Sequence, residues 1–428
     1  MFRVTEEMRK KWTPVIESAD APKIADSYRE DVTIALLEQQ SKDTSGSSFV
    51  TEAVGGDVMA TANGQVQNWD PVLIALVRRA MPQNIGFDLA SVQPMSGPTG
   101  QIFCMRSNYL VTEEGTTTAV EAFREKPNTA FSGKYTTAEA EALKGSHDDD
   151  AVSPFQSPPY QGNPTGFKKM GFTIDKATAT AKSRALRADY TREIAEDLKA
   201  IHGLDAEAEL ASILSTEIVA EMNQEIIDLI NVKAKTGAQN AGTAGTFDLV
   251  TDADGRWAVE RFKSLQFQLE IEANTIAQET RRGRGNWVLC SANVASALSA
   301  AGVLNTGAAL STGLNTDVAS TTYAGNLGTM KVYIDPFAVS DYATIGYKGA
   351  NPYDAGVFYC PYIPLSMMRA VGEEDFQPRI GFKTRYDIVT NPFTMTYVNG
   401  VATNTQGEDN TNKYFRRMDI VNINVGSA

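Results

Sequence analysis

The chain has 428 residues, of which 42% are hydrophobic, and a formal net charge of −13. This length exceeds what one hydrophobic core usually organises, so we expect two or three structural lobes. The acidic balance argues against sequence-general binding to nucleic acid, which depends on neutralising phosphates with Lys and Arg. No run of about 18 apolar residues is present, which excludes a membrane-spanning helix.

The first 52 residues are predicted to form a separate module. A helix is expected over residues 22–42, with Pro22 at its first position. Its apolar residues fall mostly on one helical stripe: Ile24, Tyr28, Val32, Ala35 and Leu36. The Ser- and Gly-rich stretch 41–48 then has the composition of a flexible linker. The segment therefore has the pattern of a detachable helical peptide.

A second, short helix is predicted from Asp70 to Pro82. Asp70 can cap its N-terminus, Pro71 suits the first helical position, and Pro82 ends it. The pair Arg78-Arg79 has two interpretations, a nucleic-acid contact or complementation of the dipole at the helix C-terminus. The second needs no ligand and is preferred.

Residues 94–170 hold seven of the 17 prolines and lack a long apolar periodicity. So long an irregular stretch is unusual inside a compact domain. It is either disordered or an extended arm that gains order from a neighbouring molecule. Its aromatic residues favour the arm, because a solvated linker has few of them: Tyr109, Phe123, Phe131, Tyr135, Phe155, Tyr160 and Phe167.

Three longer helices are predicted after the arm. The first extends from Asp175 to about His202 and is ended by Gly203. The second follows Asp205, with Glu207 and Glu209 favouring its first turn, and is ended by Gly237. The third covers 256–280.

Strands dominate after Gly285. They are predicted over 286–292, 331–337, 342–348, 356–363, 380–389 and 414–425, with a Gly/Ser/Thr/Asn-rich loop at 301–329. Helices and strands are segregated along the chain more than alternated. The predicted fold class is therefore α+β and not a doubly wound sheet.

Candidate catalytic and metal-binding groups are few. The two histidines, His147 and His202, are isolated; His147 beside three aspartates is more simply part of a solvated acidic loop than a cation site. Cys104, Cys290 and Cys360 are far apart and are interpreted as small buried hydrophobic residues. No phosphate-binding loop motif is found, and the basic stretch 281–285 is better explained as a helix C-cap and turn. We therefore predict no catalytic, cofactor-binding or metal-binding residues.

Several long segments resemble the major capsid protein of T-even-like tailed bacteriophages. One is Met170-Gly171-Phe172-Thr173-Ile174-Asp175-Lys176. The others follow in chain order: 76–82, 87–88, 92–103, 181–184, 197–206, 333–335, 357–362, 381–386 and 414–417. The resemblance extends from about residue 70 to the C-terminus.

The resemblance implies an HK-97-type capsid fold with an N-arm, an extended loop, a peripheral domain with a long spine helix, and an axial domain. The spine helix and its continuation would be residues 175–235. The implied boundaries are 1–52 for a cleavable assembly segment, 53–93 for the N-arm and first short helix, 94–172 for the extended loop, 173–282 for the peripheral domain, 283–375 for the axial domain and 376–428 for the return to the peripheral domain. The loop is shorter than in the T-even protein, so an inserted surface domain is not expected.

The resemblance also implies maturation by a phage prohead protease that cuts after Glu with an aliphatic residue two positions before it. Three motifs fit: Val15-Ile16-Glu17, Leu36-Leu37-Glu38 and Val50-Thr51-Glu52. Cleavage between Glu52 and Ala53 is favoured, because this site follows the flexible linker and frees the whole helical module.

The implied function is structural and not enzymatic: a virion protein, made late as a precursor, that forms hexameric capsomers of an icosahedral head. Its implied partners are other copies of itself, the vertex capsid protein, scaffold or core proteins, the prohead protease and decoration proteins. It would enclose double-stranded DNA without sequence-specific binding, use no cofactor, contact no membrane, and assemble in the bacterial cytoplasm. The rival interpretations are the paralogous pentameric vertex protein, an encapsulin-type compartment and, in a different class, an α+β enzyme.

Overall fold

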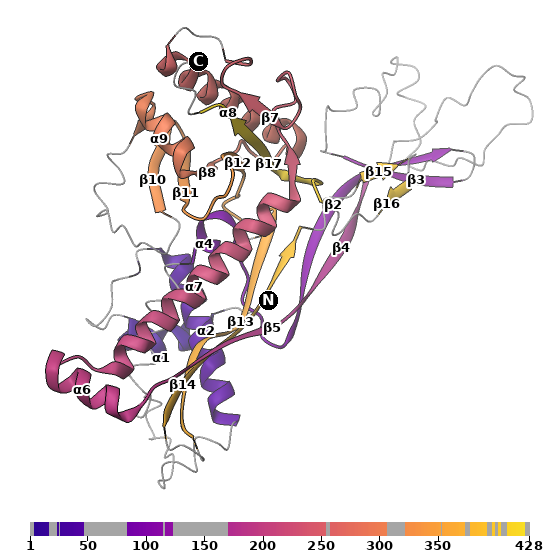
Figure 1. The fold of residues 1–428 in the computed structure, drawn as a ribbon. Helices are drawn as coiled ribbons and strands as arrows, with labels where there is room; N and C mark the ends of the chain where they lie inside the picture. Colours follow the sequence, from indigo (N-terminus) through magenta and orange to yellow (C-terminus); the bar gives the residue numbers. More distant parts are fainter. Residues whose placement is uncertain are drawn as a thin grey trace, which may run out of the picture.

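The computed structural model describes residues 4–16, 24, 26–46, 84–113, 116–122, 170–253, 257–305, 322–351, 353–372, 377–391, 396–398, 401–403 and 409–423. In this part of the chain, helices and β-sheets form two lobes joined by one long helix, with a β-hairpin extending to one side (Figure 1). The predicted α+β class is confirmed. The predicted helix at 70–82, with Arg78-Arg79, lies outside the described residues.

The lower lobe in Figure 1 is built around a four-stranded sheet and the long helix α7 (Ala206–Lys233). The strands, in sheet order, are β1 (Ser91–Val92), β13 (Val357–Val371), β14 (Pro378–Thr390) and β5 (Lys182–Asp189). The helix packs on β14 and β5. Ion pairs fasten it at the edge strand, where Arg184 of β5 reaches both Glu221 and Glu225 of α7.

Helix α7 begins where the sequence predicts it. The side chain of Asp205 caps the helix by accepting a hydrogen bond from the backbone N–H of Glu207 at 3.1 Å. Its buried residues recur every four positions, as one helical face requires: Ile218, Met222, Ile226 and Ile230. The helix ends at Lys233, before the predicted Gly237, because residues 234–236 leave it to form the short strand β6.

The predicted helix from Asp175 to His202 is wrong over most of its length. Residues up to 189 form two strands, β4 (Met170–Thr180) and β5, and only α6 (Arg192–His202) is helical. The helical spacing there depended on alanines and long charged residues, which favour a helix by intrinsic propensity but whose preference tertiary context overrides. Pairing with β2 (Thr99–Glu113) and with β14 satisfies the backbone hydrogen bonds and decides the outcome.

The upper lobe holds an eight-stranded sheet. In sheet order its strands are β6 (Ala234–Thr236), β17 (Asn412–Val421), β12 (Tyr342–Gly346), β8 (Trp287–Ser291), β11 (Met330–Asp335), β10 (Thr322–Leu327) and β9 (Leu304–Asn305), and β7 (Thr246–Asp248) also pairs with β17. Helices α8 (Ala258–Thr280) and α9 (Ala292–Ala300) cover it. The predicted strands here and in the lower lobe are confirmed, as is the helix predicted over 256–280.

One prediction about this lobe needs correction. The predicted loop at 301–329 contains β9 and β10, while 306–321 lies outside the described residues. Strand β10 pairs with β11, and β9 pairs with β10 to form the edge of the sheet. The predicted domain boundaries stay predictions. Strand pairing and packing group α8 and β17 with the eight-stranded sheet, and β13 with the four-stranded sheet, because these segments contact each other across long sequence separations.

A network of buried charges ties α8 to strand β17 of the eight-stranded sheet. The guanidinium of Arg416, on β17, is 3.1 Å from the Glu272 carboxylate and 2.7 Å from that of Glu279, both on α8. The side chains of Arg416 and Glu272 are only 2% and 3% exposed. Lys235 of β6 also pairs with Glu279, at 2.6 Å. Burial opposes ionisation of Glu279, but the hydrogen bond from Lys235 and the charge of Arg416 outweigh it and lower its pKa.

The predicted basic C-cap at 281–285 is confirmed. Arg281 ends α8 in the left-handed conformation, with φ of 53°, and its N–H donates to the carbonyl of Ala277. Arg282 pairs with Asp354 at 3.1 Å, and Arg284 pairs with Glu270. These arginines therefore serve the fold, and the nucleotide-binding interpretation is not needed.

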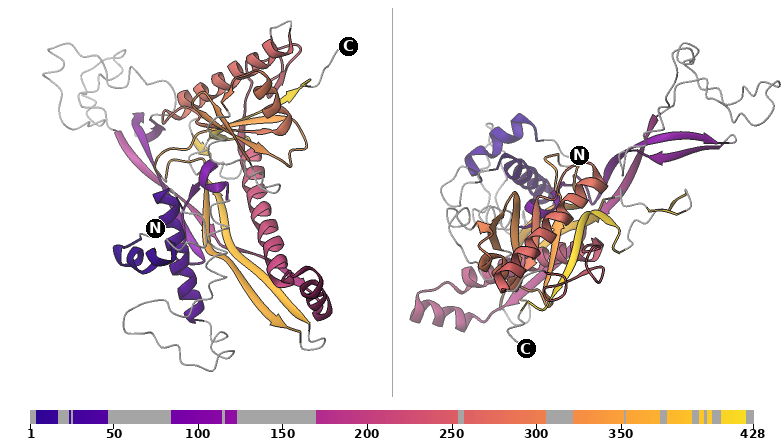
Figure 2. Two further views of the ribbon diagram at one scale, coloured as in Figure 1. Left: turned by 90° about the vertical axis from the view of Figure 1, so that its left-hand side faces the viewer. Right: turned by 90° about the horizontal axis from the view of Figure 1, so that it is seen from above.

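The described part of the predicted arm, together with the strand β4 that follows it, forms a three-stranded unit that we name the hairpin. Strand β2 pairs on one side with β3 (Thr116–Glu121) and on the other with β4. The three-stranded sheet projects beyond the two lobes in the right-hand view of Figure 2. Residues 123–169 of the arm lie outside the described residues. Elsewhere in the chain, β15 (Thr396–Val398) and β16 (Val401–Thr403) pair as a small two-stranded sheet.

The N-terminal module is a pair of helices, α1 (Glu6–Ile16) and α2 (Ser27–Gly46). The predicted helix is thereby confirmed for its described part, which starts at Ser27, whereas Pro22 lies outside the described residues. The helix continues to Gly46, so the flexible linker predicted over 41–48 is wrong over residues 41–46, while residues 47–48 lie outside the described residues. Helix α2 packs onto the lower lobe beside β13, and α1 packs on α2 (Figure 2). Their apolar side chains belong to the same core as those of α7 and the four-stranded sheet, so the module is part of the folded body.

Candidate assembly surfaces

The hairpin carries a row of exposed apolar side chains. Cross-strand register places Phe103 of β2 opposite Lys176, and Phe172 and Met170 of β4 opposite Ser107 and Tyr109. Residues directly opposite each other share a face, and alternate residues along a strand point the same way. The face therefore combines side chains that are 51–65% exposed: Phe103, Met170, Phe172 and Ile174.

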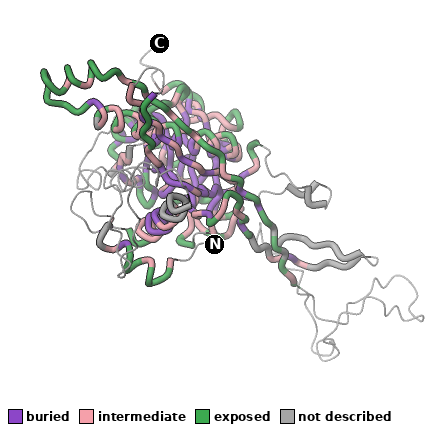
Figure 3. The backbone as a smooth tube through the Cα atoms, turned by 90° about the horizontal axis from the view of Figure 1, so that it is seen from below, coloured by how far each residue is buried: buried purple, intermediate pink, exposed green. Residues whose placement is uncertain are grey.

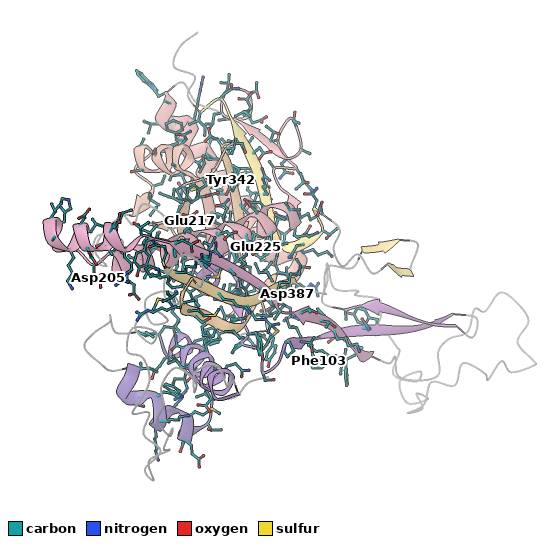
Figure 4. The ribbon with its side chains drawn as sticks, turned by 60° about the horizontal axis from the view of Figure 1, so that its bottom comes forward. Phe103, Asp205, Glu217, Glu225, Tyr342 and Asp387 are labelled. Atoms are coloured by element: carbon teal, nitrogen blue, oxygen red, sulfur yellow. The ribbon has the colours of Figure 1, made fainter. Side chains whose placement is uncertain are left out.

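The opposite face of the hairpin base belongs to the body. Ile102 and Ala179 are buried against Met95, Phe358 and Cys360. This cluster anchors the hairpin where it leaves the lower lobe, and Figure 3 shows the exposed backbone beyond it. The hairpin is therefore fixed at one end and presents its apolar face to solvent (Figure 4, Phe103).

A second exposed apolar surface lies at the outer end of the lower lobe, near Asp205 in Figure 4. Helix α6 is amphipathic but buries none of its residues. Its Ile194 and Ile201, with Leu204 after it and Ile213 on α7, are between 46% and 74% exposed. Contiguous exposed apolar side chains of this kind are typical of protein–protein contacts.

The junction between the N-terminal module and the two lobes is polar. Helix α4 (Gly86–Leu89) lies there, and Arg29 of α2 pairs with its Asp88 at 2.7 Å. Lys348, which follows β12 in the upper lobe, donates to the carbonyl of Phe87. Burial lowers the pKa of Lys348 to about 8; the negative charges of Asp88 and Asp26 act against this, and the positive charges of Arg29 and Lys331 add to it.

The lowered pKa of Lys348 makes a measurable contribution to the pH dependence of stability. The unfolded chain, with a lysine pKa of about 10.4, binds this proton more tightly than the folded chain. The contribution is therefore least favourable below about pH 8 and becomes more favourable up to about pH 10. Between pH 7.5 and 9.5 the wild-type protein should gain about 2 kcal/mol of unfolding free energy relative to Lys348→Met. Parallel pH profiles in urea denaturation would contradict this assignment.

Other candidate groups have structural roles or lie outside the described residues. Cys290 and Cys360 are buried free thiols, and burial raises the pKa of each to about 12, so both behave as the predicted small hydrophobic residues. His202 is exposed at the end of α6, while His147 is not described. Within the described ranges, no group of three or more His, Cys, Asp or Glu is arranged to hold a metal ion. No helix in that same part of the chain is long and apolar enough to span a membrane.

The three predicted cleavage motifs differ in what the structure describes. Val50, Thr51, Glu52 and Ala53 lie outside the described residues, as does Glu17. Leu36, Leu37 and Glu38 lie within α2, where Leu36 and Leu37 are 1% and 0% exposed. The Glu38 carboxylate accepts hydrogen bonds from Lys11 and from the indole of Trp12, each at 3.0 Å. The Glu38 motif is therefore helical, its two leucines are buried, and its carboxylate is hydrogen-bonded.

Comparison with known proteins identifies relatives along nearly the whole chain. Residues 66–420 match the family described as Major capsid protein Gp23. The major capsid protein of Serratia phage KSP90 is 41% identical over 442 residues, covering 98% of this chain and 99% of that protein. That of Enterobacteria phage T4 is 33% identical over 521 residues, covering 99% and 100%.

Two further similarities are weaker. The capsid vertex protein of Enterobacteria phage T4 is 28% identical over 238 residues, 52% of this chain and 53% of that protein. A solved structure, the capsid of Myoviridae phage XM1, covers 86% of this chain and 100% of its own, with 10% identity and a TM-score of 0.40.

An α+β chain with a projecting hairpin, whose full-length relatives are capsid proteins, is a structural protein of a virus shell. Its parts include those expected of the HK-97-type fold, namely an extended hairpin, a long spine helix and two lobes. The chain belongs to the Gp23 major capsid protein family of T-even-like bacteriophages. It is therefore a virion protein, and the family is structural, not enzymatic.

The T4 alignment covers 521 positions, more than the 428 residues of this chain, so the T4 protein has residues without a counterpart here. An insertion that is present in the T4 protein and absent here would produce such a difference in length.

The apolar face of the hairpin was not predicted from the sequence. Its signal was present, because Met170, Phe172 and Ile174 occupy alternate positions, which is the period of a strand.

Proposed function

We propose that the chain assembles into hexameric capsomers of an icosahedral phage head that encloses double-stranded DNA. The observation that carries this proposal is the exposed apolar face of the hairpin, formed by Phe103, Met170, Phe172 and Ile174. Burying one such side chain is worth about 1.5–3 kcal/mol. Repetition of this contact around every capsomer would stabilise a closed shell from individually modest interfaces.

In this proposal the hairpin lies over a neighbouring subunit, because it projects from the body and its apolar face is left in water by a single chain. The lobe with the four-stranded sheet and α7 acts as the peripheral domain, and the lobe with the eight-stranded sheet as the axial domain. The separation of the two lobes along α7 in Figure 1 supports this division. With a net charge of −13, the chain encloses DNA without the sequence-general phosphate contacts that depend on an excess of Lys and Arg.

Electron microscopy of the expressed chain with its scaffold or core proteins tests the proposal directly. Closed shells with six-fold capsomers are the expected result. Five-fold vertices alone would instead support the pentameric paralogue. Against that paralogue, the T4 vertex protein matches only 52% of this chain at 28% identity, whereas the KSP90 major capsid protein matches 98% at 41%. Failure to form any closed assembly would contradict a shell function.

We also propose that the subunit is made as a precursor, which a phage prohead protease cuts between Glu52 and Ala53. The position of Glu38 supports this choice over the Leu36-Leu37-Glu38 motif. Proteolysis requires exposed backbone that is free of secondary-structure hydrogen bonds. The Glu38 motif lies in a helix with its two leucines buried, so cutting there would require α2 to unfold.

The cleavage site can be read from the mass of subunits in mature particles. We expect an N-terminus at Ala53, abolished by Glu52→Gln and unaffected by the matched Glu38→Gln. Particles of the Glu52→Gln variant should instead contain subunits with the mass of the uncut precursor. A mature N-terminus at Gln39 would contradict the proposed site and would show that α2 opens before it is cut.

A further inference from the structure

The middle of helix α2, residues 32–37, is covered on all sides. Six consecutive residues, from Val32 to Leu37, are each 3% exposed or less. Successive residues of an α-helix are turned by about 100°, so six in a row point in every direction around the axis. A helix buried all round needs partners on more than one side. One side is covered by α1, and another by the body of the subunit.

The two helices of the module are tied to each other by their own contacts. Arg9 of α1 pairs with Asp31 of α2 at 2.5 Å. The Glu38 carboxylate of α2 binds both Lys11 and the buried Trp12 of α1. These bonds lie entirely within the module and join α1 and α2 to each other.

A second set of contacts joins the module to the body. The hydroxyl of Tyr28 donates to the carbonyl of Val92 in β1. The guanidinium of Arg29 pairs with Asp88 of α4 at 2.7 Å and lies 5.4 Å from the centre of the Phe87 ring. Further along α2, the Gln39 amide donates to the carbonyl of Ser96 at 3.3 Å. The docking surface is therefore the body segment from α4 through β1, together with β13.

From these contacts we infer that the helix pair α1–α2 is a non-covalent ligand of the α4–β1–β13 surface and stays bound after the backbone following it is cut. Cleavage and release are then separate steps. Release requires α4 to give up Arg29, which is its charged contact with the module. The role of this contact in maturation rests on the proposed removal of residues 1–52. The binding of the helix pair to the body does not depend on that proposal.

The test uses the full chain with residues 47–52 replaced by the recognition sequence of a site-specific laboratory protease. After complete cutting, confirmed on a denaturing gel, the protein is passed over a gel-filtration column at physiological salt. We expect residues 1–46 to co-elute with the body. Separation of the fragment from the body in the unmutated cut protein would overturn the inference, whether or not the body stays folded.

Variants then identify the contact that holds the fragment. Arg29→Gln and Asp88→Asn should each speed dissociation of the cut fragment by about tenfold, the factor that corresponds to roughly 1.4 kcal/mol. The matched control is Arg9→Gln, which removes an Arg–Asp pair inside the module and should leave retention nearly unchanged. Equal effects of Arg29→Gln and Arg9→Gln would overturn the role of α4. None of these measurements uses the phage protease or shell assembly, so failure here is distinguishable from failure of the proposed function.

Discussion

Replacing Arg416 by alanine is expected to lower the free energy of unfolding by about 3–5 kcal/mol. The cause is the buried carboxylate that the substitution leaves behind. Glu272 is 3% exposed and keeps only neutral donors, the Gln268 amide at 3.0 Å and the Ala238 N–H at 2.8 Å. An ionised carboxylate without a counter-charge is costly inside a protein. Equilibrium unfolding in urea, followed by far-UV circular dichroism, measures the change.

The adjacent arginine provides the matched control. Arg417 pairs with Asp419 at 2.9 Å, but both side chains are substantially exposed, at 33% and 50%. Exposed pairs contribute about 0–1 kcal/mol, so Arg417→Ala should have a small effect. The double variant Arg416→Met/Glu272→Leu removes both charges together and should recover much of the loss. Similar effects of Arg416→Ala and Arg417→Ala would contradict the importance of burial.

The double substitution Phe172→Thr/Ile174→Thr is expected to abolish shell assembly while leaving the isolated subunit folded. Both side chains are mostly in water, at 65% and 58% exposure, so the monomer loses little burial. Threonine is β-branched, which suits a strand. In the proposed shell, however, each side chain would lose about 1.5–3 kcal/mol of burial at every copy of the contact.

Sedimentation and electron microscopy of the expressed protein would measure assembly, and thermal unfolding would measure the monomer. The control is Val259→Thr, which makes the same kind of change on α8, where the valine is 44% exposed. We expect shells from Val259→Thr and none from the hairpin variant. Normal shells from both variants would remove the hairpin face from the interface.

Helix α7 was predictable because its signals are local. Asp205 caps it, and its buried residues repeat at helical spacing over 28 residues. Strand β8 was predictable for a related reason: all five of its residues are buried, and the sequence shows a short apolar run after Gly285. In both cases each residue's neighbours in sequence determine its structure.

The segment 175–189 was mispredicted because its structure depends on distant residues. Lys182–Asp189 forms β5 only because β14, nearly two hundred residues away, pairs with it. The apolar residues Ala177, Ala181 and Leu186 have a helical spacing that the strand does not use. Pairing across such a separation leaves no local pattern, so no reading of the segment alone distinguishes the two structures.

For the candidate sites, the sequence by itself indicated the family, the long arm and the three cleavage motifs, and it predicts that the N-terminal helices are detachable. Tertiary structure alone decided that the Glu38 motif is packed inside α2, that Arg416 is a buried charge, and that Phe103 shares one face with Phe172. Motifs and caps are encoded by neighbouring residues, whereas burial and cross-strand faces arise from contacts between segments far apart in the chain. The arm that the sequence left irregular is, in its described part, a hairpin whose exposed face suits assembly.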